Sequence, residues 1–260
     1  MLLLYVAFLF LIGIILMSTN ASSISGGSGS ALYPKSLPNS KKQLWDRKEL
    51  QVNQLLQDIY RDQAVYTKDN EKIKYTSGVN PAEGYFLYKL AKDNNLENVL
   101  EVGMANGTSA LYICQAMKEN KSGTLISVDP FQSTQWQNVG MLNIERAKLE
   151  AHHELMETTS DLALPELLKE KREFDMIFVD GMHLFDYTLL DIYYAAKLLK
   201  KGGILVVDDI KHKGVKKAID YISGNYTFLK RAASTMASAT MGMFIKEKED
   251  TRLWNFHEDF

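Results

Sequence analysis

Short apolar runs rich in β-branched residues recur along the middle of the chain. The clearest are NVLEV at 98–102, TLISV at 124–128, FDMIFV at 174–179 and GILVV at 203–207. Continuous apolar runs of this length are typical of buried parallel strands. HHELME at 152–157 predicts a less regular strand between the second and third runs.

Stretches with helical spacing separate these runs. They predict helices at 108–119, 138–149, 162–170, 186–200 and 214–222, and we expect Lys201, Gly202 and Gly203 to end the fourth. Strands that alternate with helices form a doubly wound α/β sheet of Rossmann-like type, with ligands at the carboxyl ends of the strands. YTFLKRA at 226–232 and SATMGMFIKEK at 238–248 then predict an antiparallel pair at one edge.

The chain begins with an uncharged apolar segment, MLLLYVAFLFLIGIILM. At about 1.5 Å per residue, a helix of this length reaches the lower limit for crossing a bilayer. We therefore expect residues 1–21 to form a hydrophobic N-terminal helix that is a transmembrane anchor. A cleaved signal peptide is the alternative, because Thr19 and Ala21 are small residues suited to a cleavage site. Serine and glycine then predict a flexible linker over 22–44.

A single domain is expected over residues 45–260, since no second linker or internal repeat interrupts it. Apolar residues at helical spacing after Trp45 predict an N-terminal helical lid. Lys35, Lys41 and Lys42 follow the apolar segment and no basic residue precedes it, which favours a membrane-anchored protein whose domain over 45–260 is cytoplasmic. Entry into the secretory pathway is the alternative if the segment is cleaved.

Composition excludes several classes of protein. The 260 residues are 46% hydrophobic and 24% charged, which excludes a disordered or collagen-like chain. Thirty basic and thirty-two acidic side chains give a net charge of −2, so no global positive field is available and nucleic acid is excluded as the main partner. The single cysteine, Cys114, excludes an internal disulfide and a thiolate-rich metal site.

The first strand runs into a loop with two glycines, EVGMANGTSA at 101–110. Gly103 and Gly107 permit a tight turn, so the loop can hold a polar ligand at a helix N-terminus. The Gly-x-x-x-Gly spacing differs from a dinucleotide fingerprint, which counts against NAD. Asp129 follows the second strand, where a carboxylate can accept both hydroxyls of a ribose. Its alternative role is that of a turn residue before Pro130.

Four segments resemble the class I S-adenosylmethionine-dependent methyltransferases: VLEVGMANGTS, SVDP, FDMIFVDG and LLKKGGILVVDD. The resemblance covers about residues 75–247. It implies that Glu101, Gly103 and Gly107 line the methionine part of the cofactor and that Asp129 binds the ribose. Ser160 and Asp161 match the region that borders the adenine. We add Asn106 and Ser109, which belong to the glycine loop or the helix it opens, to the cofactor-binding candidates.

GVNPAEGYFL at 78–87 resembles a segment of the metal-dependent caffeoyl-CoA and catechol O-methyltransferases. VDPFQSTQW and VDGMHLFDYTLLD are similar to a bacterial group related to the macrocin-type sugar O-methyltransferases. The resemblance implies that Asp180, Asp208 and Asp209 bind a divalent metal, with magnesium expected from three hard oxygen ligands. Asp209 replaces the asparagine of the catechol enzymes, which favours acceptors other than simple catechols. A pair that caps the next helix is the alternative for Asp208 and Asp209.

His183 stands where the catechol and caffeoyl-CoA enzymes carry a lysine assigned to proton removal. An imidazole is a suitable general base near neutral pH, so His183 and Asp180 are the catalytic candidates. The alternative is that His183 only orients a metal-bound carboxylate or packs beneath its loop. His212 is a minor candidate that follows the Asp208–Asp209 pair.

The function expected from these features is metal-assisted O-methylation of a small hydroxylated molecule, with S-adenosylmethionine and a divalent metal as cofactors. The membrane is a partner through the N-terminal segment, and a homodimer is left open. One alternative is a membrane-tethered scaffold that binds the cofactor without turnover. Another is an NAD-linked oxidoreductase, for which no catalytic Tyr-x-x-x-Lys unit stands at a strand end.

Overall fold

The computed structural model describes residues 51–232 and 240–260. The chain divides into two units, Met1–Ser40 and Lys41–Phe260, and every described residue lies in the second. The predicted hydrophobic helix over 1–21 and the linker over 22–44 lie outside the described residues. Within 51–232 and 240–260, no helix combines the length and apolar character needed to cross a bilayer. The anchor and the cytoplasmic location stay predictions.

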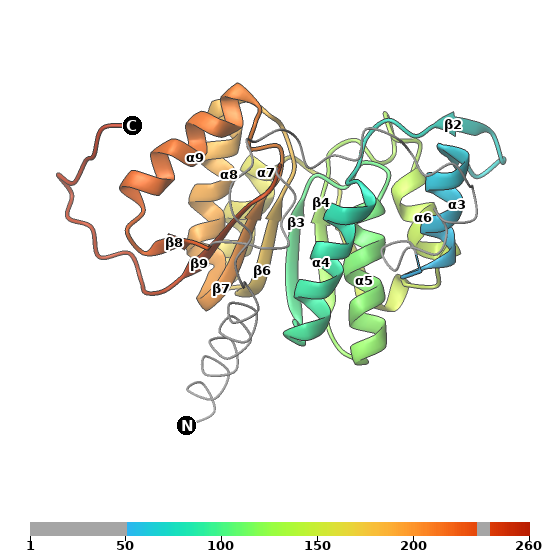
Figure 1. The fold of residues 1–260 in the computed structure, drawn as a ribbon, viewed down its shortest axis with the longest axis horizontal. Coiled ribbons are helices and arrows are strands. Elements are labelled where there is room, and N and C mark those ends of the chain that lie inside the picture. Colours follow the sequence, from blue (N-terminus) through green and yellow to red (C-terminus); the bar gives the residue numbers. More distant parts are fainter. Residues whose placement is uncertain (1–50, 233–239) are drawn as a thin grey trace, which may run out of the picture. The chain divides into compact units, whose positions relative to one another are not determined.

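A seven-stranded sheet forms the centre of the described fold, in the order β5-β4-β3-β6-β7-β9-β8 (Figure 1). The strands are β3 (Asn98–Val102), β4 (Thr124–Val128), β5 (His153–Met156), β6 (Phe174–Val179), β7 (Leu199–Val207), β8 (Leu229–Arg231) and β9 (Gly242–Lys246). The first five strands in this order are parallel, and β9 runs antiparallel between β7 and β8. The predicted α/β class and antiparallel edge pair are therefore confirmed.

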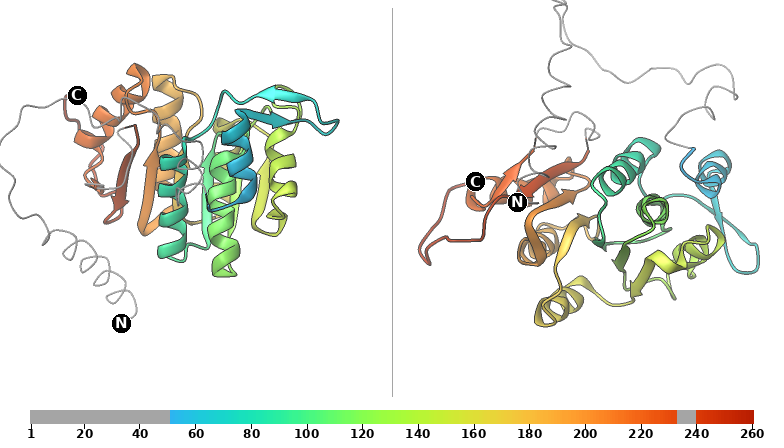
Figure 2. Two further views of the ribbon diagram at one scale, coloured as in Figure 1. Left: turned by 45° about the vertical axis from the view of Figure 1, so that its right-hand side comes forward. Right: turned by 90° about the horizontal axis from the view of Figure 1, so that it is seen from below.

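Helices cover both faces of the sheet (Figure 2). One face carries α4 (Pro81–Asp93), α5 (Thr108–Asn120), α6 (Val139–Arg146) and, farther out, α3 (Gln54–Asp62). The other carries α7 (Ser160–Lys169), α8 (Phe185–Leu198) and α9 (Lys213–Asn225). Along β3, Val99 packs into the first core and Leu100 into the second. Burial of both faces explains why the strands are continuously apolar.

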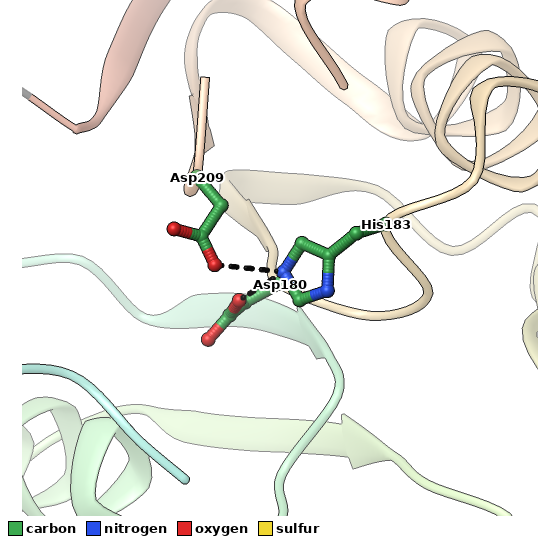
Figure 3. A group of neighbouring side chains, drawn as sticks. All are labelled: Asp180, His183 and Asp209. Carbon is green, nitrogen blue, oxygen red and sulfur yellow. Dashed lines mark ion pairs between the residues drawn. The ribbon is translucent and has the colours of Figure 1, made fainter. Parts of the chain in front are cut away.

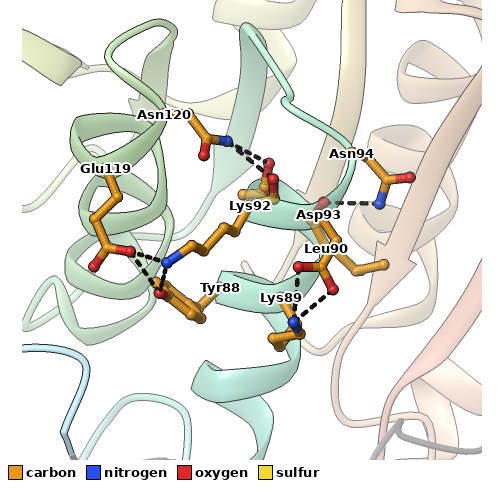
Figure 4. A network of polar contacts seen from close by, with 9 residues as sticks. Tyr88, Lys89, Leu90, Lys92, Asp93, Asn94, Glu119 and Asn120 are labelled. Carbon is orange, nitrogen blue, oxygen red and sulfur yellow. Dashed lines mark hydrogen bonds and ion pairs between the residues drawn. The ribbon is translucent and has the colours of Figure 1, made fainter.

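Helix α4 is absent from the sequence-based prediction, although its start carries a clear signal. The Asn80 side chain accepts the backbone N–H of Glu83, and the Glu83 carboxylate accepts that of Asn80. Such a capping box, followed by proline at the first helical position, identifies a helix start. Figure 4 shows α4 joined to α5 through Tyr88, whose hydroxyl donates to Glu119 at 2.7 Å, and through the ion pair of Lys92 with Glu119.

Several boundaries differ from the prediction. The expected helix at 138–149 is the shorter α6, followed by a 3-10 turn η1 (Glu150–His152). The expected helix end at Lys201–Gly203 is wrong, because α8 ends at Leu198 and those residues lie inside the nine-residue strand β7. The pairing of β7 with β6 shifts register between Phe174 and Met176, and Gly202 takes a positive φ of 86°. The glycines thus form an irregularity in the strand instead of a loop.

Two short strands, β1 (Ala64–Tyr66) and β2 (Lys72–Lys74), form a separate antiparallel hairpin that the hydrophobic pattern did not predict. Three-residue strands are too short to show a period. Arg146 of α6 ties the hairpin to the domain, donating to the carbonyls of Tyr66 and Thr67 at 2.7 and 2.8 Å. The predicted N-terminal helical region is present as α3, packed through Leu56 and Ile59.

Candidate active site

The carboxyl ends of four neighbouring strands meet at one edge of the sheet. Gly103 donates its backbone N–H to the carbonyl of Val128, Asp180 donates to Val102, and Asp208 donates to Val179, at 2.9–3.0 Å. The residues that follow β3, β4, β6 and β7 are therefore placed side by side. This is the arrangement that the alternating pattern predicts.

Gly103 lies where the β3 loop touches the end of β6. Its φ is +91°, and a Cβ at this position would lie 2.2 Å from the carbonyl oxygen of Asp180. Any other residue would be strained and would collide with backbone. Gly107, at φ +75°, approaches Gly140 of α6 in a similar way. The two glycines hold a narrow loop at the N-terminus of α5, where free backbone N–H groups favour a polar ligand.

Asp129 organises this loop from the end of β4. Its Oδ2 accepts the backbone N–H groups of Met104 and Ala105 at 3.1 and 2.8 Å, and its Oδ1 accepts that of Phe131 at 2.8 Å. A carboxylate has about four acceptor positions, so these bonds leave little capacity for a ribose. The structure thus gives Asp129 a loop-holding role beside the predicted ribose contact, which stays a prediction.

Glu101, Ser109 and Asn106 are buried in the same region. The hydroxyl of Ser127 donates to Glu101 at 2.6 Å, and burial raises the pKa of Glu101 to about 7. Asn106 donates its side-chain N–H to the carbonyl of Ser77 at 2.7 Å. All three side chains are therefore packed inside the domain, and their predicted contact with the cofactor stays a prediction.

The predicted adenine-side residues lie at the start of α7. Ser160 is half-buried and Asp161 is exposed. Burial raises the pKa of Asp191 of α8 to about 6, and its interaction with the Ser160 side chain opposes that rise. Ser160 and Asp161 are placed on the carboxyl edge as expected, and their contact with adenine stays a prediction.

A second group of side chains lies at the ends of β6 and β7 (Figure 3). Nε2 of His183 is 2.9 Å from Oδ2 of Asp209 and 3.6 Å from Oδ1 of Asp180. One ligand atom from each of these three residues lies within 4.8 Å of the others, a spacing that suits a metal ion. The residues come from the end of β6, the loop after it and the end of β7.

The convergent group differs in composition from the predicted set of metal ligands, Asp180, Asp208 and Asp209. Asp208 does not belong to the three residues whose ligand atoms converge. It is 7% exposed, and its Oδ1 accepts the backbone N–H of Asp209 at 2.7 Å. Asp209 adopts a positive φ of 52°, an uncommon backbone conformation for a residue other than glycine. His183 stands in the convergent group instead.

Negative charge accumulates at this edge. Burial and the nearby carboxylates of Asp180 and Glu83 raise the pKa of Asp208 to about 8, and burial also raises the pKa of Asp180. Contact with the Asp180 carboxylate raises the pKa of His183, against the effect of burial. Buried carboxylates without full compensation are costly, and a cation relieves that cost. The donor set therefore fits a divalent ion.

Glu83 and His212 complete the surroundings of this group. Glu83, from the first turn of α4, is 6% exposed and accepts the hydroxyl of Thr240. The sequence reasoning missed its place here, although the capping box at 80–83 placed it at a helix start. His212 lies 3.9 Å from Oδ1 of Asp209, and its ring is 4.9 Å from that of His183.

Comparison of the sequence with known proteins identifies the family of this chain. A methyltransferase-domain model matches residues 100–210. Over 189 residues, the chain is 30% identical to a caffeoyl-CoA O-methyltransferase of Populus kitakamiensis, covering 66% of this chain and 77% of that protein. It is 28% identical over 171 residues to a catechol O-methyltransferase of Niastella koreensis, covering 63% of this chain and 74% of the relative.

The fold is also shared with a solved O-methyltransferase from Bacillus cereus in complex with SAH. The TM-score is 0.59 at 18% identity, over 79% of this chain and 96% of that one. The comparisons do not support the scaffold or oxidoreductase alternatives. The chain therefore belongs to the class I S-adenosylmethionine-dependent O-methyltransferases, in the group that includes the catechol and caffeoyl-CoA enzymes.

Proposed function

We propose that the protein methylates a hydroxyl group of a small molecule with the assistance of a divalent metal ion. The observation that carries this proposal is the convergence of Asp180, His183 and Asp209 within 4.8 Å, next to the glycine loop. Gly103 packs closely on the backbone carbonyl of Asp180, so the glycine loop and the group of Asp180, His183 and Asp209 are neighbours. A methyl donor on the loop and an acceptor at the acidic group would then be adjacent.

When bound, S-adenosylmethionine supplies an electrophilic methyl group, and a divalent ion supplies positive charge that lowers the pKa of a hydroxyl. The residues of this chain position these groups. Asp129 holds the Met104–Ala105 backbone, while Asp180 and Asp209 would bind the ion. Fixing both partners in one geometry removes much of the entropic part of the barrier.

The acceptor surface has an apolar component. Met182 and Leu184, on either side of His183, are 51% and 54% exposed, and Phe131 after β4 is 43% exposed. Exposed apolar side chains beside a polar centre favour a ligand that has an apolar body and a hydroxyl. The names of the relatives, catechol and caffeoyl-CoA O-methyltransferase, agree with such an acceptor.

The role of His183 as general base stays a prediction. Its Nε2 is buried between the two carboxylates, so an acceptor hydroxyl has little access to that atom. Asp180 and Asp209 thus surround the nitrogen that would have to accept the proton.

The test is methyl transfer from labelled S-adenosylmethionine by the full-length protein, with a panel of catechols, caffeoyl esters and sugars. We expect transfer that stops with a chelator and resumes when divalent ions are restored. Asp180→Asn should abolish it, whereas Asp220→Asn, which changes an exposed carboxylate paired with Lys216, should not. Equal transfer with and without chelator would refute metal assistance, and failure to bind S-adenosylmethionine would refute the whole proposal.

A further inference from the structure

The position of His183 carries an inference about which metal the site selects, and it rests on the proposed function. The ring nitrogen Nε2 is buried and lies 2.9 Å from Asp209 Oδ2 and 3.6 Å from Asp180 Oδ1. Despite these distances, Nε2 makes no aligned hydrogen bond to either carboxylate. Nε2 and the two carboxylate oxygens therefore converge at ion-pair distances, and Nε2 has no aligned hydrogen bond to either oxygen.

The two separations from Nε2 are close to those of neighbouring ligands around one ion. Two ligands that each lie about 2.1 Å from a metal, at tetrahedral or octahedral angles, are roughly 3.0–3.4 Å apart. The two distances from Nε2, 2.9 and 3.6 Å, lie on either side of this range. Small shifts of the side chains would bring all three atoms to a common centre.

The convergent group also contains fewer oxygen ligands than the sequence predicts for a magnesium site. Asp208 does not belong to the convergent group, and one of its oxygens accepts the backbone N–H of Asp209. Two carboxylates and one imidazole remain. Magnesium prefers a near-octahedral set of oxygens, whereas imidazole suits first-row transition ions.

We propose that Nε2 of His183 is a metal ligand, and that Asp180, His183 and Asp209 form a mixed nitrogen and oxygen site that selects a transition ion such as Mn²⁺, Fe²⁺, Co²⁺ or Zn²⁺ over Mg²⁺. His212 orients the site from outside. Its ring lies 4.9 Å from the His183 ring, and its Nε2 faces the other oxygen of Asp209 at 3.9 Å. Histidine and carboxylate side chains that contact metal ligands in this way commonly change the affinity of the site for its metal ion.

The decisive measurement is pulsed electron paramagnetic resonance of the full-length protein loaded with Mn²⁺. A coordinated imidazole gives nitrogen modulation, which a histidine acting only as a base or as a packing residue does not. We expect modulation in the native protein, loss of it in His183→Asn and His183→Gln, and retention in His257→Asn, which changes an exposed histidine of the C-terminal tail. Thermal unfolding of each variant verifies that it is folded.

Calorimetric competition gives the selectivity. We expect Co²⁺ and Mn²⁺ to displace Mg²⁺ from the native protein, and His183→Asn to lose about 10- to 100-fold in Co²⁺ affinity with little change for Mg²⁺. No nitrogen modulation in the native protein, modulation lost only in His212→Asn, or equal selectivity in native protein and His183→Asn would each overturn the assignment. Methyl transfer measured on the same samples separates this result from the proposed function. Transfer without nitrogen modulation removes only the ligand role, and modulation without transfer removes only the function.

Discussion

The β3–β4 half and the β6–β7 half of the carboxyl edge hold their carboxylates in different ways. In the β3–β4 half, Asp129 accepts three backbone N–H groups, and Glu101 accepts the hydroxyl of Ser127. In the β6–β7 half, Asp180 and Asp209 face the nitrogen of His183 without an aligned hydrogen bond from it. Backbone hydrogen bonds thus hold the Asp129 carboxylate in the first half, whereas Nε2 of His183 in the second half lacks an aligned hydrogen bond.

This difference indicates two modes of preorganisation. A loop fixed by its own hydrogen bonds presents backbone groups to a cofactor at no further cost of ordering. A group of carboxylates held close together stores repulsion that a cation relieves on binding. Gly103 joins the two halves, because it packs directly on the carbonyl of Asp180.

The largest effect should come from Gly103→Ala, which breaks that junction. The new Cβ would lie 2.2 Å from a backbone oxygen at a φ of +91°, so strain and overpacking together should cost about 4 kcal/mol. Gly202→Ala is the matched control. It has a φ of +86° with nothing within 4 Å, and should cost about 1 kcal/mol. Urea unfolding measures both, and equal losses would show that the contact is unimportant.

Glu101→Gln should change how stability depends on pH. The pKa of Glu101 is about 7 in the folded state against an ordinary 4.5, so the folded state keeps a proton that the unfolded state releases. Stability is therefore lost as pH rises from 4.5 to 7, by roughly 3 kcal/mol at most. The variant should not show this loss.

His153 acts in the opposite direction, because burial lowers its pKa from 6.5 to about 4 and stability is lost as pH falls below 6.5. The difference between native protein and Glu101→Gln isolates the carboxyl, since both contain His153. Urea unfolding at about pH 5 and about pH 8 measures it. A constant difference across this range would mean that Glu101 does not titrate there.

Asp129→Ala should weaken S-adenosylmethionine binding by about 100-fold, because three backbone N–H groups lose their acceptor and the loop loses its shape. Metal binding at Asp180 and Asp209 should change little. Calorimetry with each ligand checks this. An equal loss for cofactor and metal would show that the two halves are one cooperative unit.

Asp209→Asn should give the smallest effect, and unlike Asp129→Ala it should weaken metal binding and leave cofactor binding intact. The amide keeps one oxygen but loses the charge, so metal affinity should fall about tenfold while cofactor binding is retained. Asp250→Asn, which changes a carboxylate paired with Arg252 in the tail, is the control. The assignment of Asp209 fails if its variant binds Mn²⁺ as tightly as the control does.

Local patterns predicted most of the sheet and the residues at its edge. Apolar runs identified β3, β4, β6 and the end of β7, since burial of both strand faces is visible in the sequence itself. The capping box at 80–83 could have identified α4 in the same way. The hairpin of β1 and β2 could not be found by pattern, because three residues define no period.

The sequence alone determined the fold class, the glycine loop and the carboxylates that follow each strand, because hydrophobic period and strand order place these residues at one edge. Only the tertiary structure decided how their side chains are used. Asp208 lies outside the convergent group, and the loop after β6 brings His183 close to both Asp180 and Asp209. Such choices depend on backbone angles and on contacts between elements distant in sequence, which no local pattern contains.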